Sequence, residues 1–348
     1  MKIKTGLLQD KIYRKLHSWF WNKLRPGRWS LWLFRSYWNY RFMNLKKNKV
    51  REEITRSYLT QAPNRGAGIG HQMGNWNSGY WFAKRFGVPY AYSAFSDPAW
   101  EKFLGFGEGE ITAEELLRQG YKKRKLPYFE ETSIEDMKLI QAMIDSYRGK
   151  RVVFFLELDQ FYEKQYGAME HMRKKFYTAP ARKDENLIFQ NDHLNIAVHI
   201  RRGDITAGQE TQEEELTKRW LKTEYYVRLL QELLGLLSAD VTYRIYLFSQ
   251  GTESDFPELK EIPNVVYCLD MPAKESFLHM ARADVLLTSK SSFSYKPALL
   301  SKGIKLCPAH FWHGYPESED FIIVDEETGL KEEQRASICR QLKQIGKK

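Results

Sequence analysis

Residues 193–205 read His-Leu-Asn-Ile-Ala-Val-His-Ile-Arg-Arg-Gly-Asp-Ile, an apolar strand that ends in a cluster of charge. Its apolar first part has the composition of a buried parallel strand, and its end carries His199, Arg201, Arg202 and Asp204. Two adjacent guanidiniums at the end of a buried strand are costly to desolvate, so they predict an anionic ligand. The carboxyl ends of strands are where open α/β sheets bind ligands. Surface ion pairs are the alternative interpretation.

Apolar runs and amphipathic segments alternate after this strand. We expect strands at 195–200, 242–248, 265–269, 284–288 and 305–307, and helices at 223–237, 254–261, 274–282 and 293–302. The first half has strand patterns at 58–63, 88–92 and 152–156 and helix patterns at 71–86, 111–119 and 133–147. Such alternation predicts α/β architecture with parallel sheets.

The length of 348 residues favours two domains after an N-terminal arm. We place the arm at 1–50, an acceptor-side α/β domain at 51–185 and a donor-binding domain at 186–348. The boundary between the two domains is the polar stretch 180–192. The expected fold is two Rossmann-like domains facing a cleft.

The positive charge of the chain is concentrated in the arm. Residues 1–50 hold 13 lysines and arginines against the single acid Asp10, a net +12, whereas the other 298 residues hold 41 basic and 43 acidic groups. The near-neutral body argues against a nucleic-acid-binding globular surface. Cys268, Cys307 and Cys339 show no metal-ligand spacing. Together with the lack of a signal peptide or a long apolar run, they indicate a cytoplasmic protein.

The arm interleaves basic and aromatic residues between 11 and 45. A cationic helix with an indole-rich face suits the headgroup layer of an anionic membrane. A pair of helices packed on the protein body is an almost equal alternative, and single-stranded nucleic acid is a third.

A glycine-rich loop, Gly66-Ala67-Gly68-Ile69-Gly70, connects the first expected strand to the first expected helix. It does not match the G-x-G-x-x-G dinucleotide motif, because His71 and Met73 stand where glycine is required, and no Walker A lysine follows. Its amides could approach a phosphate at the start of a helix. A plain tight turn explains the loop equally well.

A second turn, Thr288-Ser289-Lys290-Ser291-Ser292-Phe293-Ser294, follows an apolar strand and starts a helix. Its hydroxyls, helix amides and lysine suit a diphosphate. No D-x-D pair occurs in the chain, so the usual metal cradle of nucleotide-sugar enzymes is missing. Cations and amides could instead stabilise a departing nucleoside diphosphate.

Three strings, Gly-Ile-Gly-His-Gln-Met at 68–73, His-Ile-Arg-Arg-Gly-Asp at 199–204 and Ser-Lys-Ser-Ser-Phe-Ser at 289–294, occur in this order. Together they resemble the inverting fucosyltransferases, the α1,2-, α1,6- and protein O-fucosyltransferase superfamily. The resemblance covers about residues 60–310. It implies the two-domain GT-B fold, metal-independent catalysis and GDP-β-L-fucose as donor.

The resemblance also implies roles for single residues. Arg202 or Arg201 would clamp the β-phosphate beside His199. The rest of the implied donor site is Gly70, Gly251, Lys290, Ser291, Ser292 and Phe293, with Glu253 or Asp255 as guanine acceptors. Many members have Gly-Asn-Gln where this chain has Gly70-His71-Gln72. The candidates for the base are Asp204, His71 and Glu157, and Asp204 could instead orient an arginine.

The sequence thus predicts a cytoplasmic, membrane-peripheral fucosyltransferase that needs neither cofactor nor metal and binds no nucleic acid. Its expected acceptor is an oligosaccharide or lipid-linked glycan, as in polysaccharide biosynthesis, and residues 1–50 would contact an anionic membrane. Two alternatives stay open: a transferase that uses another nucleotide sugar, and a non-catalytic, membrane-tethered module that binds nucleotide or glycan.

Overall fold

The computed structural model describes residues 28–45, 57–157, 160, 164–203, 205 and 218–345. Asp204 and most of the arm therefore lie outside the described residues. The chain divides into two compact units. Unit 1 comprises 1–64, 75–94 and 109–162, and unit 2 comprises 65–74, 95–108 and 163–348.

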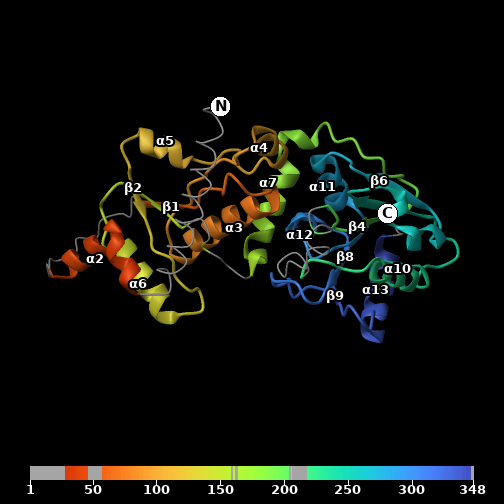
Figure 1. The fold of residues 1–348 in the computed structure, drawn as a ribbon. Coiled ribbons are helices and arrows are strands. Elements are labelled where there is room, and N and C mark those ends of the chain that lie inside the picture. The colour runs from red at the N-terminus through yellow and green to blue at the C-terminus, as the bar shows by residue number, and fades with distance from the viewer. Residues whose placement is uncertain are drawn as a thin grey trace, which may run out of the picture. The chain divides into compact units, whose positions relative to one another are not determined.

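Unit 2 contains a six-stranded, all-parallel sheet (Figure 1). Its strands are β4 (Leu194–His199), β5 (Tyr243–Ser249), β6 (Val265–Leu269), β7 (Val285–Leu287), β8 (Ile304–Pro308) and β9 (Phe321–Val324). They are arranged β6-β5-β4-β7-β8-β9, which is 3-2-1-4-5-6 when counted from β4. This is the strand order of doubly wound nucleotide-binding sheets. The predicted α/β fold with parallel sheets is confirmed.

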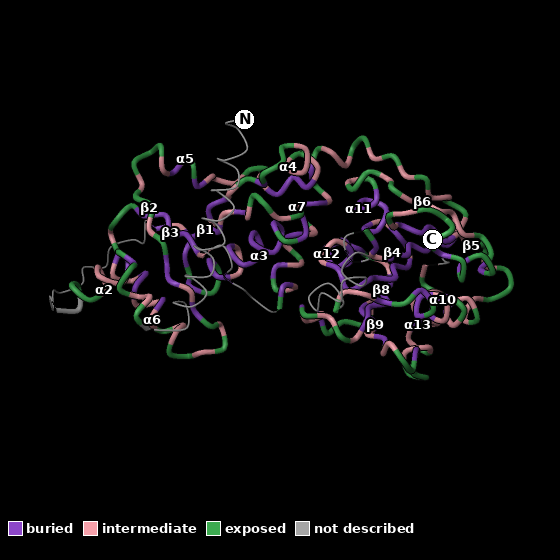
Figure 2. The backbone as a smooth tube through the Cα atoms, viewed as in Figure 1, coloured by how far each residue is buried: buried purple, intermediate pink, exposed green. Residues whose placement is uncertain are grey.

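Helices cover both faces of this sheet. The main helices of unit 2 are α4 (Pro98–Leu104), α7 (Met169–Thr178), α10 (Thr223–Leu234), α11 (Ala273–Arg282), α12 (Ser292–Leu300) and α13 (Glu332–Ile345). Ile196 and Val198 of β4 belong to the same buried cluster as Leu229 of α10 and Ile338 of α13, whereas α11 and α12 pack together and α11 contacts β4. Central strands are buried on both sides (Figure 2), as continuous apolar runs require.

Unit 1 has a smaller parallel sheet of order β1-β3-β2. Its elements are η1 (Arg28–Leu33), α2 (Arg35–Leu45), β1 (Ser57–Thr60), α3 (Ile69–Arg85), α5 (Ala113–Arg118), β2 (Lys122–Lys125), α6 (Ile134–Asp145) and β3 (Val152–Phe155). The first residues of α3, 69–74, are counted with unit 2. Val152 and Phe154 face a core shared with α3 and α6, while Val153 and Phe155 face α5, as a two-residue period requires.

Several segments differ from the expectation. The stretch 88–92 forms single bridges to Leu59 and Thr112 instead of a strand. The helix expected at 254–261 is two 3₁₀ turns, η4 (Glu253–Asp255) and η5 (Pro257–Glu261), because Pro257 lacks the amide that a continuous helix would need. Two further 3₁₀ turns, η2 (Gln165–Ala168) and η3 (Pro180–Arg182), flank α7.

The contacts also divide the body differently from the expected boundary at 185/186. Residues 163–185 lie with unit 2, because α7 packs on α12 and Arg173 donates to the carbonyls of Leu299 and Ser301 at 2.9 and 2.7 Å. Within the described ranges, no helix is both long and apolar enough to cross a bilayer.

Candidate functional site

The motif residues of unit 2 meet where the strand order of its sheet reverses. β4 pairs with β5 on one side and with β7 on the other, in parallel, so the residues that follow β4 and β7 emerge side by side. His199 ends β4, and Thr288 and Ser289 follow β7. This switch point is the usual ligand position of such sheets.

His199 joins the two strand ends. Its Nδ1 lies 2.7 Å from Ser289 Oγ, and its ring centroid lies 5.6 Å from that of Phe293. Burial, together with the nearby Arg201, lowers the pKa of His199 to about 3. The imidazole is therefore neutral at physiological pH and can exchange a hydrogen bond with Ser289 without adding charge.

The serine turn builds the start of α12. Ser291 is the N-cap, and its Oγ accepts a hydrogen bond from the Phe293 amide at 3.2 Å. Ser294 Oγ lies 3.2 Å from Ser289 Oγ and also contacts the Ser289 and Ser291 carbonyls. The serine hydroxyls thus stabilise the turn itself. This turn positions the N-terminus of α12 at the switch point of the sheet.

The two adjacent arginines turn to opposite sides of the sheet. Arg201 Nη1 donates to Ser291 Oγ at 3.2 Å, so its guanidinium lies beside the serine turn. Arg202 Nη1 donates to the carbonyls of Arg201 and Leu221 at 2.9 and 3.2 Å, and its Nη2 donates to Thr223 Oγ1 at 2.8 Å. The side-chain alternation of β4 continues past its end and separates the pair.

Arg202 is therefore occupied within unit 2. Its guanidinium carbon lies 4.0 Å from the centroid of the Trp220 ring, and only 8% of the residue is exposed. Burial lowers its pKa, although Tyr226 and nearby carboxylates oppose this effect. Arg201 is only partly buried. Of the two predicted phosphate ligands, Arg201 is the one that lies beside the serine turn.

The glycine loop also reaches this turn. A Cβ atom added to Gly70 would lie 2.9 Å from the backbone carbonyl carbon and oxygen of Ser292. The first turn of α3 therefore packs directly on the first turn of α12, and glycine is required at that contact. Gln72 holds the loop, because its Nε2 donates to the Ala67 carbonyl and to Ser96 Oγ, both at 2.8 Å.

His71, on the same turn of α3, is exposed and lies near the buried His313. Burial lowers the pKa of His313 to about 2, and Lys296 and His71 add to the effect. Lys296 is fully buried on α12 and donates to Gln165 Oε1. Burial lowers its pKa to about 7. The sequence interpretation did not identify Lys296, because a lysine in a helix ordinarily indicates a solvent-exposed position.

Other predicted site residues have structural partners. Lys290 Nζ lies 2.7 Å from Glu326 Oε2, a partner 36 positions away that no local pattern could indicate. Gly251 has a φ of 111°, and its missing Cβ leaves room for Asp255, whose carboxylate accepts from the Thr252 amide at 2.7 Å.

Three further candidates are Glu253, Glu157 and Asp204. Glu253 lies exposed at the start of η4. Glu157 belongs to unit 1, where Lys125 Nζ lies 3.8 Å from its Oε1. Asp204 follows the described residues of the turn, and its predicted role stays a prediction.

Gly203 sets the direction in which the chain leaves the arginines. It has a φ of 74°, and an added Cβ would lie 2.2 Å from Gln250 Oε1. Both the left-handed backbone and the close side chain favour glycine here. The glycine of the Arg-Arg-Gly string is thus explained by local geometry.

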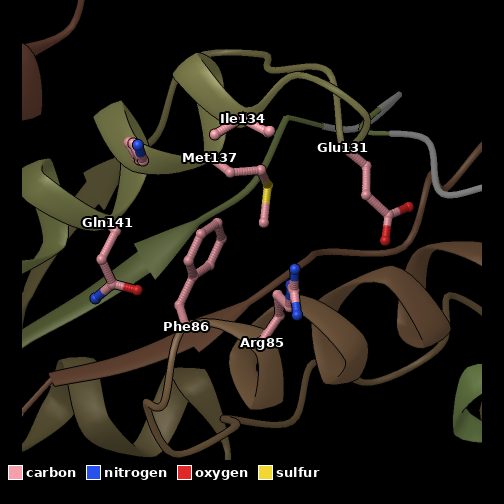
Figure 3. A pocket seen from close by; sticks show the side chains of 7 residues that line it. Arg85, Phe86, Glu131, Ile134, Met137 and Gln141 are labelled. Atoms are coloured by element: carbon pink, nitrogen blue, oxygen red, sulfur yellow. The ribbon is translucent and has the colours of Figure 1, made fainter.

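The described part of the chain also contains a pocket of about 330 Å³ in unit 1. It lies between the end of α3 and the start of α6, and Figure 3 shows Phe86 and Met137 turned toward one another there, with Arg85 and Glu131 at its side. None of the predicted site residues lines it. No group of three or more His, Cys, Asp or Glu that could hold a metal occurs among the residues that the structure describes.

No family model matches the sequence, and no curated protein is significantly similar to it. Several solved structures are similar to this chain over most of their own length. Fucosyltransferase NodZ from Bradyrhizobium is 12% identical with a TM-score of 0.36, and the match covers 71% of this chain and 93% of that one. POFUT1 in complex with GDP is 12% identical with a TM-score of 0.46, and the match covers 73% of this chain and 99% of that one. A mutant Arabidopsis thaliana FUT1 in complex with GDP is 11% identical with a TM-score of 0.43, and the match covers 85% of this chain and 77% of that one.

Proposed function

We propose that this chain is a glycosyltransferase that moves L-fucose from GDP-β-L-fucose to a glycan hydroxyl, with inversion and without a metal. The observation that carries the proposal is the hydrogen bond between Arg201 and Ser291 at the switch point of the sheet. There, a guanidinium and the amides at the start of α12 lie together, and this is the chemistry that a diphosphate requires.

In the proposed reaction the acceptor hydroxyl attacks the anomeric carbon of fucose while the bond from that carbon to the β-phosphate oxygen breaks. The electron pair leaves with GDP, and Arg201 and the α12 amides stabilise the growing negative charge. His199 stays neutral and holds Ser289 in place. The hydroxyl proton passes to a base, for which Asp204 and His71 are the candidates on unit 2.

We assign Arg202 a different role from Arg201. Its hydrogen bonds to Leu221 and Thr223 support a structural function, which is to hold the segment before α10 against the end of β4. The proposed acceptor is an oligosaccharide or a lipid-linked glycan of a cell-surface polysaccharide, and the proposed location is cytoplasmic.

A donor screen tests the proposal. GDP-fucose, GDP-mannose and UDP-sugars are compared by nucleotide release, with and without EDTA, and GDP and UDP are compared by thermal shift. We expect the greatest stabilisation by GDP, the fastest release from GDP-fucose, and release that EDTA does not change. Preferential stabilisation by UDP would favour the alternative donor. GDP binding without turnover on any acceptor would favour a non-catalytic binding module.

A further inference from the structure

The described part of the arm exposes an unusual number of large apolar side chains. Of the eight exposed large hydrophobic residues in the described chain, five lie between positions 29 and 43. They are Trp29 (79% exposed), Trp32 (55%), Leu33 (62%), Phe42 (59%) and Met43 (43%), and we call them the aromatic face. A monomeric protein in water rarely gathers such residues unless they meet a partner.

The aromatic face is ordered by contacts within η1 and α2. Trp38 packs edge-on against Trp32 with ring centroids 4.9 Å apart, and it stacks on Phe42 at 6.0 Å. The Trp38 indole donates to the Trp32 carbonyl at 2.9 Å. The three rings therefore form a continuous row that is in place before any partner binds.

The opposite side of α2 is fixed to unit 1. Ser36 is buried and donates to the Lys125 carbonyl at 2.7 Å, and Asn39 donates to Ser146 Oγ at 2.8 Å. Tyr37 and Tyr40 pack against the core of unit 1. Because both sides of α2 carry aromatic residues, burial against unit 1 accounts for one side only. The outer side needs another explanation.

Positive charge surrounds this helix. Residues 28–45 contain no acid, and Arg35 and Arg41 are exposed. Strand β2, Lys-Lys-Arg-Lys, contacts α2, and Lys150 Nζ donates to Asn39 Oδ1 at 3.0 Å. Burial and the neighbouring Arg124 and Lys122 lower the pKa of Lys150, which indicates crowded cations. The charge of Lys125 is partly balanced by Glu157, because Lys125 Nζ lies 3.8 Å from Glu157 Oε1.

We propose that the aromatic face, together with the exposed Arg35 and Arg41 of α2, binds the interface of a bilayer that contains anionic lipids. Indole and phenyl rings favour the headgroup boundary, and basic side chains are attracted to an anionic surface. A second copy of the chain would bring like charges together, which disfavours a dimer through this surface. The inference rests on unit 1 and does not depend on the donor.

Vesicle co-sedimentation of the full chain tests this surface. We compare phosphatidylcholine vesicles with vesicles that also contain phosphatidylglycerol, for the wild type and for the triple variant Trp29→Ser, Trp32→Ser and Phe42→Ser. The expected result is binding only to the anionic vesicles and at least about tenfold weaker binding of the triple variant. Arg35→Gln with Arg41→Gln, at exposed positions of α2, is expected to weaken binding and its dependence on phosphatidylglycerol.

The matched controls are Ile134→Ser and Trp312→Ser, which change exposed apolar residues elsewhere and are expected to bind like the wild type. Retained vesicle binding by the triple variant would overturn the proposal. So would a triple variant that loses self-association or single-stranded nucleic-acid binding while the wild type ignores vesicles. GDP thermal shifts, measured without lipid, report on the proposed donor site separately.

Discussion

Unit 2 buries Arg202, Lys290, Lys296 and Lys305, whereas every described lysine and arginine of unit 1 with an assigned burial remains at least partly exposed. Each buried cation has a polar partner: Lys290 has Glu326, Lys296 has Gln165, Lys305 has Asp320, and Arg202 has carbonyls and Thr223. Buried charge is tolerated only with such partners.

Similar residues therefore serve different purposes in the two units. In unit 2 the buried lysines and Arg202 bind partners within the unit. Arg201 is only partly buried at a strand end, and it lies beside the serine turn. In unit 1 the cations of β2 stay at least partly exposed. Composition alone would have treated these two groups as equivalent.

The largest effect that would test this contrast is expected at Arg201. Arg201→Ala should lower turnover at least about 100-fold, because a group that stabilises transition-state charge is lost. The melting temperature should change little, since Arg201 is only partly buried. Nucleotide release and thermal denaturation measure the two effects.

Arg202→Ala is the matched comparison. It removes the donor to Leu221 and Thr223 and leaves a gap under Trp220, so we expect it to destabilise the fold by about 2–4 kcal/mol. If Arg202→Ala instead left stability intact and abolished turnover, Arg202 would be the phosphate ligand, as the motif alone allows.

Gly70→Ala tests the contact between the starts of α3 and α12. The added methyl would lie 2.9 Å from the Ser292 backbone, which cannot move without displacing the turn. We expect a loss of about 1–3 kcal/mol in the free energy of unfolding, measured with urea. Gly68→Ala is the control, since nothing lies within 4 Å of its Cβ position. Equal stability of the two variants would contradict the packing contact.

Lys296→Met tests how the buried lysine of α12 affects the dependence of stability on pH. The folded-state pKa of Lys296, about 7, lies below its ordinary value of 10.5. Between these values the unfolded chain binds more protons, so stability rises with pH, by at most about 1.4 kcal/mol per pH unit. The variant should show a shallower rise between pH 7 and 10 in urea titrations. Lys302→Met, at an exposed position, should keep the wild-type slope, and an unchanged slope in both would contradict a neutral Lys296.

Asn39→Ala addresses unit 1 and has the smallest expected effect. It removes the hydrogen bonds from Asn39 to Ser146 and from Lys150 to Asn39, for a loss of about 1 kcal/mol. GDP thermal shifts should stay unchanged. Arg41→Ala, at an exposed site on the same helix, should fall within about 0.5 kcal/mol of the wild type. A loss of GDP binding in Asn39→Ala would show that the two units do not act separately.

The sequence predicted the strands of unit 2 well, because apolar runs such as 195–200 and 265–269 end in polar turns. It also placed the Arg-Arg and serine turns at strand ends. The Ser133 cap of α6 was predicted and is present, with the Asp136 amide donating to its Oγ at 3.2 Å. These features are local, and local patterns determine them.

Partners that are distant in sequence were not predictable. The pairing of Lys290 with Glu326 depends on how β7, β8 and β9 are ordered. The contact of Gly70 with Ser292 joins α3 to α12, which lie far apart in the sequence. The basic strand β2 has no apolar residue to reveal it. The different directions of Arg201 and Arg202 follow from strand alternation, but only the fold shows which side faces α12.

The contact at Gly70 has a consequence for reading relatives of this chain. Since main-chain atoms of Ser292 fill the space, no exchange of the serine side chain could accommodate a larger residue at position 70. Natural selection would then retain this glycine even in descendants that had lost the proposed activity. Its conservation in an alignment would mark shared architecture, and the presence of Arg201 would be the better guide to retained chemistry.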